Sequence, residues 1–130
     1  GAFQEMPESV ENIHKADLRH PPAQHPGIAV GEYEMAVSIE VAEHIEPEYE
    51  WSYLQWLTRG NRLLLTAARP GQGGLNHVNE RPSAHWKNAL RKRGFIFRPR
   101  QTAAWKKQAR ENTGGCPWVV DNAMFFKRHA

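Results

Sequence analysis

Short apolar runs alternate along this chain with segments that have the spacing of helices. The segments 33–41, YEMAVSIEV, and 62–68, RLLLTAA, are near-continuous apolar runs of the length that buried strands have. We therefore predict that both are strands, the first buried and the second covered on both faces. Shorter apolar segments predict three further strands, at 12–18, 95–98 and 118–127.

Three predicted helices separate these strands. The first begins near Pro47, whose missing N–H costs nothing in a first helical turn, and ends before Gly60, which we expect to be a left-handed cap. Its apolar face consists of Tyr49, Tyr53, Trp56 and Leu57. The second begins at Ser83 as N-cap and ends at Gly94, and the third spans 102–112. This alternation predicts an α/β fold with a mostly parallel sheet and helices on both faces.

Composition limits the class of protein. A chain of 130 residues can form one hydrophobic core, so we expect a single domain over residues 1–130. No apolar run approaches the roughly 18 residues of a membrane span, and no secretory signal is visible, although an organelle address could have been removed earlier. The single cysteine, Cys116, excludes an internal disulfide and favours a reducing compartment. We therefore predict an intracellular protein, in the cytoplasm or an organelle.

Basic residues gather late in the chain, between residues 87 and 110. They are Lys87, Arg91, Lys92, Arg93, Arg98, Arg100, Lys106, Lys107 and Arg110. Such a cluster can be a face for nucleic acid or another polyanion. It can equally be the solvated side of two amphipathic helices, and the absence of an RNA-binding motif favours this second interpretation.

Four segments together resemble the class I S-adenosylmethionine-dependent methyltransferases. They are ADLRHP at 16–21, YEMAVSIEVAEHIEPEYE at 33–50, LLLTAARPGQGGLNHVNERP at 63–82 and RGFIF at 93–97. They are most similar to the subgroup in which the fourth strand runs into E-x-x-E-H-I and the fifth into P-G-Q-G-G. The resemblance implies a Rossmann-like methyltransferase fold, with a doubly wound sheet of seven strands and the cofactor at the carboxyl ends of the first strands.

The resemblance also implies contacts with S-adenosylmethionine. Asp17 and Leu18 stand where the family binds the adenine amine. The end of the fourth strand approaches the methionine part of the cofactor, and here that place holds Ser38, Ile39 and Glu40.

The N-terminal part of the family pattern differs in this chain. Gln4 stands where an acidic residue grips the ribose, so the neighbouring Glu5 would have to supply the charge. The family's first strand and its glycine-rich loop are missing, and the glycines at 71–74 follow a late strand and cannot replace them. We therefore expect a partial domain whose open sheet edge is covered by another polypeptide.

The resemblance implies a site for the methyl acceptor. Glu40, Glu43 and His44 match the E-x-x-E-H pattern that looks like a divalent-metal site in small-RNA 2′-O-methyltransferases and ubiquinone-pathway O-methyltransferases, with His77 as a further ligand. Mg²⁺, Mn²⁺ or Zn²⁺ would lower the pKa of an acceptor hydroxyl. In a second interpretation no metal binds, Glu43 supports the turn, and His44 packs beside the cofactor or acts as the general base.

Two functional hypotheses remain open from the sequence. One is a methyltransferase in which Glu43 and His44 are catalytic and the acceptor is RNA or a small molecule. The other is an inactive methyltransferase-like subunit of a larger complex. Both place Asp17, Glu40 and His77 together with the catalytic pair at one edge of the sheet, because the carboxyl ends of parallel strands meet there. The polar loop 76–80 is expected to be held by its own hydrogen bonds.

Overall fold

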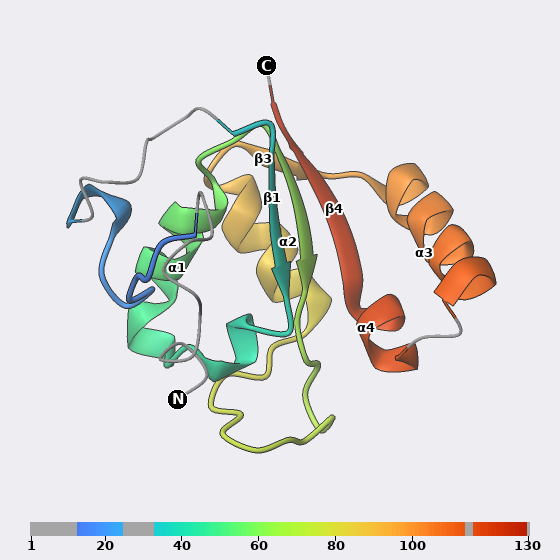
Figure 1. Cartoon of the computed structure of the whole chain (residues 1–130), viewed down its shortest axis with the longest axis horizontal. Helices are drawn as coiled ribbons and strands as arrows, with labels where there is room; N and C mark the ends of the chain where they lie inside the picture. Colours follow the sequence, from blue (N-terminus) through green and yellow to red (C-terminus); the bar gives the residue numbers. More distant parts are fainter. Residues whose placement is uncertain (1–12, 25–32, 114–115, 130) are drawn as a thin grey trace.

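A computed structural model describes residues 13–24, 33–113 and 116–129, and in these ranges the chain forms one mixed sheet (Figure 1). Its strands lie in the order β1-β2-β4-β3 and are β1 (Met35–Ile39), β2 (Arg62–Thr66), β3 (Phe95–Phe97) and β4 (Ala123–Arg128). β1 and β2 are parallel, whereas β4 runs antiparallel to both β2 and β3. The α/β class is as predicted, but the expectation of a mostly parallel sheet is wrong.

The direction of β4 follows from the helices before it. α3 (Pro99–Thr113) carries the chain from β3 to α4 (Pro117–Asn122), which lies beside the end of the sheet where β4 begins (Figure 1). The next strand must therefore run back along the sheet. The strand predicted over 118–127 is wrong in its first half, since Pro117 presets the backbone of a first helical turn and strand geometry begins only at Ala123.

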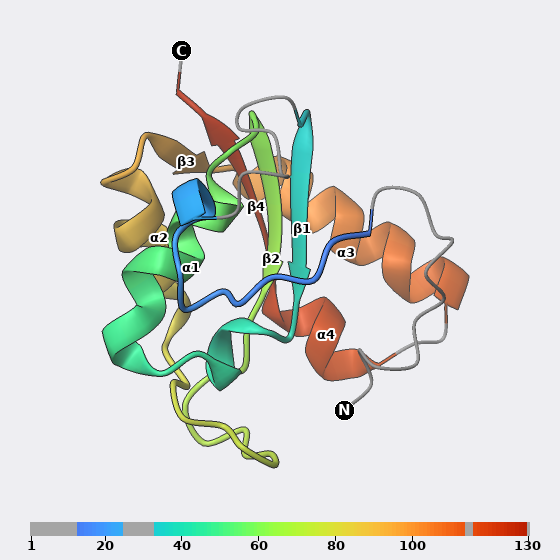
Figure 2. The same ribbon diagram turned by 60° about the vertical axis from the view of Figure 1, so that its left-hand side comes forward.

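Helices cover both faces of the sheet, as the sequence predicts (Figure 2). α1 (Glu50–Leu57) and α2 (Ser83–Arg91) pack on one face, and α3 and α4 lie on the other. The main core lies under α1 and α2, where Tyr53, Trp86 and Leu90 pack against Leu63 and Leu65 of β2. Each of these large side chains contributes roughly 1.5–3 kcal/mol by leaving water.

β1 is an exposed edge strand, although its apolar sequence predicts a buried one. Ala36 and Ser38 face the core under α1, but Met35, Val37 and Ile39 on the opposite face are exposed. α3 and α4 pack against β4 and β2 and leave this part of the sheet uncovered. Among the described residues, no strand pairs with the outer edge of β1.

Several element boundaries also differ from the expectations. Residues 13–17 are irregular rather than a strand, and 25–32 and residue 12 lie outside the described ranges. Ser83 is the first residue of α2, after Pro82 as cap, and Gly94, three residues after the helix ends at Arg91, has a positive φ of 83°. Gly60 is not a left-handed cap: it is needed because a Cβ there would clash with the carbonyl oxygen of Tyr33.

Short 3-10 turns complete the described elements: η2 (Pro22–Gln24), η3 (Ala42–His44) and η4 (Pro47–Tyr49). The helix expected from Pro47 therefore begins as η4 and becomes α-helical at Glu50. In the ranges that the structure describes, none of the helices combines the length and the apolar character that crossing a bilayer needs.

Candidate metal centre

Three metal-ligating side chains converge at the carboxyl ends of β1 and β2. Glu43 and His44 lie in η3 directly after β1, and His77 lies in the loop after β2. One ligand atom from each lies within 4.8 Å of the other two. The parallel pairing of β1 and β2 explains this proximity, because it brings the segments after both strands to the same edge of the sheet.

Glu43 is buried, with 1% of its side chain exposed. Its Oε2 has no hydrogen-bond partner in the described structure, and burial raises the pKa of the carboxyl group. The backbone carbonyl of Glu43 accepts hydrogen bonds from the N–H groups of Val78 and Asn79 at 2.8 and 3.0 Å. This pair of bonds ties the loop that carries His77 to the turn that carries Glu43.

His44 is oriented by a backbone carbonyl. Its Nδ1 lies 3.2 Å from the carbonyl oxygen of Asn76. Since a carbonyl oxygen only accepts, Nδ1 carries the proton in this bond and Nε2 of the neutral ring keeps a free lone pair. Asn76 has a positive φ of 61°, and in this conformation its carbonyl points toward Nδ1 of His44. The rings of His44 and His77 meet edge to face, with centroids 4.8 Å apart.

His77 is oriented by a carboxylate. Its Nδ1 lies 2.8 Å from Oε2 of Glu80, and its Nε2 lies 3.9 Å from Oε1 of Glu43. The hydrogen bond from His77, followed by those from the N–H groups of Gly73 and Gly71, holds the pKa of Glu80 below its usual range. An ionised Glu80 fixes the proton on Nδ1 of His77, so its Nε2 is free to bind a metal, as in carboxylate–histidine–metal arrangements.

The glycine-rich loop keeps this nitrogen accessible. Gly74 has a φ of 155°, and a Cβ at this position would lie 2.5 Å from Nε2 of His77. Gly71 and Gly73 also have positive φ values, of 85° and 73°. The P-G-Q-G-G segment is thus a turn that needs glycine for its positive φ angles, and in addition it leaves the space in front of His77 open.

Glu40 lines the same cleft but is not part of the cluster of three. Its Oε2 accepts a hydrogen bond from Oγ1 of Thr66 at 2.9 Å. Its Oε1 accepts longer hydrogen bonds from Nδ2 of Asn122 at 3.4 Å and from Nε2 of Gln72 at 3.5 Å. Its φ of 51° is unusual for a residue other than glycine and costs on the order of 1 kcal/mol or more. Of the four predicted metal ligands, the structure therefore brings three together.

The cleft has a volume of about 430 Å³. Its walls include the three ligands, Glu40, Gln72, the glycine loop and Trp118 at the start of α4. Trp118 is 52% exposed. The predicted strand over 118–127 does not anticipate this exposed position on a helix, and only the Pro117 that precedes Trp118 signals a helix start there.

The residues predicted to bind the cofactor do not line one common cleft. Asp17 and Leu18 line a separate groove of about 450 Å³ that His44 also borders, so they do lie near the cluster. Arg19 binds both carboxylate oxygens of Asp17 and holds its pKa well below the usual range. Ser38 is buried in a hydrogen bond with Tyr53.

Two further residues, Ile39 and Glu5, are predicted to contact the cofactor. Ile39 points to the exposed face of β1 and lines neither the cleft nor the groove beside Asp17. Glu5 and Gln4 lie outside the described residues.

The cluster fits a transition-metal ion better than magnesium. Zinc binds histidine nitrogen and carboxylate oxygen at about 2.0–2.2 Å in a tetrahedral arrangement, so two of its ligand atoms lie about 3.4 Å apart. The Nε2 of His77 and the Oε1 of Glu43 lie 3.9 Å apart and would approach by about 0.5 Å on binding zinc, and the full span of 4.8 Å would shorten by roughly 1.4 Å. Two imidazoles and one carboxylate suit zinc or iron, whereas magnesium prefers oxygen ligands and water.

The chain was compared with protein families, with curated proteins and with solved structures, and none of the three comparisons finds a match. Its function is therefore inferred from the geometry of the cleft and from the topology of the sheet.

Proposed function

We propose that this chain forms the acceptor side of an S-adenosylmethionine-dependent methyltransferase, with a divalent transition-metal ion bound by Glu43, His44 and His77. The observation that carries this proposal is that both histidines have Nδ1 engaged, by Asn76 and by Glu80, and therefore have Nε2 free. Two rings oriented in this way beside a buried carboxylate with an unpartnered oxygen are the arrangement that a metal site requires.

The topology of the sheet supports this proposal. In a doubly wound sheet of strand order 3-2-1-4-5-6, the fourth and fifth strands are parallel neighbours and the first strand pairs with the outer edge of the fourth. β1 and β2 are parallel neighbours and would be those two strands. The outer edge of β1, which no described strand covers, is then the place of the first strand.

Each residue of the cleft has a distinct task in this proposal. Glu43, His44 and His77 hold the ion, which when bound supplies the Lewis acid that lowers the pKa of an acceptor hydroxyl. Because His44 uses Nε2 for this purpose and Nδ1 for Asn76, it is a ligand rather than the general base. Trp118 and Gln72 border the space in which the acceptor is aligned for in-line attack, and alignment is the main requirement of such a transfer.

The described residues do not by themselves fit S-adenosylmethionine. The carboxylate of Asp17 is fully engaged by four hydrogen bonds from Arg19, and the hydroxyl of Ser38 is buried against the hydroxyl of Tyr53, so neither side chain is presented to the cofactor. We propose that a further polypeptide segment pairs with β1 and completes the donor site. The exposed apolar residues of β1 equally favour the second candidate function, an accessory subunit whose open edge is covered by a larger partner.

Cobalt substitution tests the acceptor-side function without the donor. Co²⁺ is added to the chain and catechol, a small diol, is titrated while the visible d–d bands of cobalt are recorded. We expect a saturable change at one catechol per chain that is absent in Glu43→Ala. 1,2-Dimethoxybenzene, which has no hydroxyl, is the matched control ligand. An unchanged spectrum, or an equal response to the control, contradicts the proposal.

Equilibrium dialysis tests the donor side. The 130-residue chain alone is expected to bind S-adenosylmethionine no more tightly than millimolar, because several hydrogen bonds to polar ligand groups are missing. Micromolar binding by the isolated monomer would show that no further segment is required.

A further inference from the structure

Three basic side chains converge on Asp121 of α4. An NH₂ group of Arg69 and the Nζ of Lys106 both donate to the backbone carbonyl of Asp121, each at 2.8 Å. An NH₂ group of Arg110 donates to the Oδ1 of the same residue at 2.8 Å. Arg69 follows β2, whereas Lys106 and Arg110 lie on α3. We call Arg69, Lys106 and Arg110 the cation cluster.

The cation cluster has more positive charge than its surroundings neutralise. Asp121 is the carboxylate with which it forms a described ion pair, and that pair uses Arg110 alone. Arg69 and Lys106 share a neutral carbonyl oxygen instead. Burial, and next the charge of Arg69, lower the pKa of Lys106, as expected where cations are crowded together. Such crowding is unfavourable unless an anion joins it.

The three cations do not themselves line the cleft, but the residue that they bind, Asp121, lies next to residues of its wall. Trp118 lies one helical turn before Asp121 on α4 and forms a wall of the cleft. Asn122, directly after Asp121, donates from Nδ2 to Oε1 of Gln72 at 2.8 Å, and Gln72 forms another part of the wall. Figure 1 shows α3 and α4 on the same side of the sheet, with α4 beside the end where β2 runs into the loop.

We propose that the acceptor molecule carries one or more phosphate groups, which bind Arg69, Lys106 and Arg110 while an adjacent part of the acceptor lies against Trp118. This inference rests on the proposed function, because it places the reacting hydroxyl at the neighbouring Glu43–His44–His77 cluster. Guanidinium groups match phosphate oxygens in geometry and charge, and an exposed aromatic ring beside cations is the arrangement by which proteins hold nucleotides.

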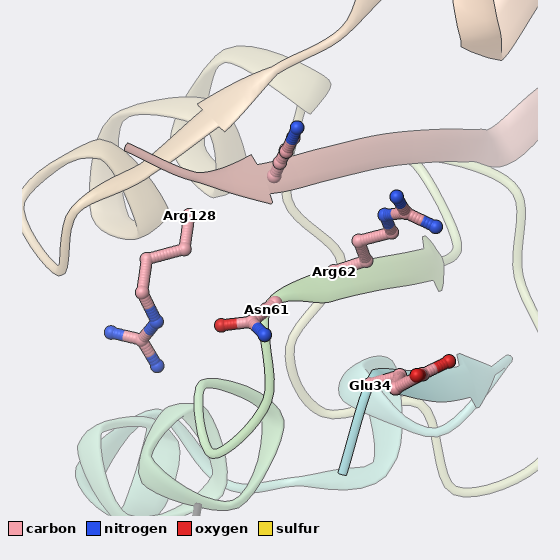
Figure 3. Close-up of a pocket in the computed structure, with 5 residues that line it drawn as sticks. Glu34, Asn61, Arg62 and Arg128 are labelled. Atoms are coloured by element: carbon pink, nitrogen blue, oxygen red, sulfur yellow. The ribbon is translucent and has the colours of Figure 1, made fainter. Parts of the chain in front are cut away.

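A second basic pocket lies at the opposite end of the strands and serves as a control. Its volume is about 370 Å³, and Glu34, Asn61, Arg62, Lys127 and Arg128 line it (Figure 3). It lies where β2 begins, away from the carboxyl ends that carry the cleft. The guanidinium of Arg128 is already engaged by the carbonyls of Thr58 and Gly60. None of the described residues that line this pocket is aromatic.

The test measures binding of two phosphate probes to the full chain by fluorescence anisotropy in EDTA. The probes are a fluorescein-labelled single-stranded ten-nucleotide RNA and, as competitor, adenosine 5′-monophosphate. Replacing Arg69, Lys106 and Arg110 by glutamine is expected to weaken RNA binding at least about tenfold and to flatten the slope of log K against log salt by about 2–3. The matched control, Arg62→Gln with Lys127→Gln, is expected to change affinity less than twofold.

Two more variants guard against misfolding. Lys106→Arg keeps the charge and should retain binding, whereas Arg110→Gln alone, at a side chain that is 57% exposed, should weaken it. Competition by adenosine 5′-monophosphate at its own micromolar affinity indicates a small phosphomonoester acceptor, and RNA binding without such competition indicates a nucleotide chain.

Equal loss in the triple variant and in the control variant, or no binding of either probe, overturns the inference. Because EDTA is present, this result is independent of the metal. A failed cobalt–catechol titration with intact phosphate binding contradicts the metal function alone.

Discussion

The Nε2 of His77 lies 3.9 Å from the Oε1 of Glu43, too far apart for a hydrogen bond and within about 0.5 Å of the separation of two ligands on a tetrahedral zinc ion. The Nδ1 of the same ring is held at 2.8 Å by Glu80. The cluster is thus built so that its ligands are positioned by neighbours and not by one another, which is the arrangement expected of a preorganised metal site.

Glu80→Gln should weaken zinc binding by about 10–100-fold although Glu80 is not a ligand. The amide oxygen of glutamine is a weaker acceptor for His77 and for the two glycine N–H groups than a carboxylate is. Competition titration with a chromophoric chelator measures the effect. Glu111→Gln, an exposed glutamate on α3, is the control and should bind zinc normally. Unchanged affinity in Glu80→Gln would mean that Glu80 does not orient His77.

Gly74→Ala should reduce zinc affinity, whereas Gly71→Ala should not. Both positions have positive φ, so each alanine costs roughly 1–2 kcal/mol of stability. Only at Gly74 does the new Cβ meet the imidazole of His77, whereas nothing lies within 4 Å of a Cβ at Gly71. Zinc affinity and thermal unfolding of the two variants separate the effects. Equal zinc affinities would contradict the role assigned to Gly74.

Glu43→Gln should stabilise the metal-free protein at neutral pH. Burial raises the pKa of Glu43 in the folded state, so the folded protein binds this proton more tightly than the unfolded chain. Stability is therefore lost as pH rises from about 4.5, the ordinary value, through the raised pKa, and stays low above it.

Thermal unfolding in EDTA at several pH values measures this effect. In Glu43→Gln the loss of stability with rising pH should disappear, because the titrating carboxyl group is gone. The control Glu48→Gln, at an exposed position, should still show this loss. Zinc at a hundred times its dissociation constant should stabilise the unmutated protein by about 2.7 kcal/mol and Glu43→Gln by much less. A lower stability of metal-free Glu43→Gln at neutral pH would argue that the carboxylate is favourable there.

Val37→Lys and Leu64→Lys should differ sharply in stability although these residues are partners on β1 and β2. Val37 is 56% exposed and its lysine should change the free energy of unfolding by less than about 0.5 kcal/mol. Leu64 is 5% exposed, so a lysine there should cost about 3 kcal/mol or more. Urea denaturation measures both. A large loss in Val37→Lys would mean that this face of β1 is covered.

The sequence predicts local structure here better than it predicts direction and burial. The apolar runs locate β1 and β2, and Gly94 locates the end of α2, because these signals lie within a few residues. Nothing within YEMAVSIEV distinguishes a central strand from an edge strand, since exposure depends on which elements cover it. The antiparallel course of β4 depends on where α3 and α4 deliver the chain, which is a property of the assembled fold.

The candidate site shows the same contrast between what local sequence predicts and what depends on the assembled fold. Glu43, His44 and His77 could be predicted because parallel strands bring their carboxyl ends together. That Glu40 would bind Thr66 instead of joining them depends on a backbone conformation at positive φ, which no sequence signal marks. Trp118 was not predicted as part of the site because its apolar run predicts a strand over 118–127, and its exposure depends on α4, which the sequence did not predict.

Isothermal titration of the untagged 130-residue chain with zinc, manganese and magnesium tests the metal site most directly. We expect one zinc ion per chain at micromolar or lower dissociation constant, with magnesium binding much more weakly because two of the three ligands are imidazoles. Glu43→Ala and His77→Ala should each abolish this binding, whereas His14→Ala, which removes an exposed histidine elsewhere, should leave it intact. Absence of saturable binding for all three ions, or unchanged zinc binding in Glu43→Ala, would contradict the account.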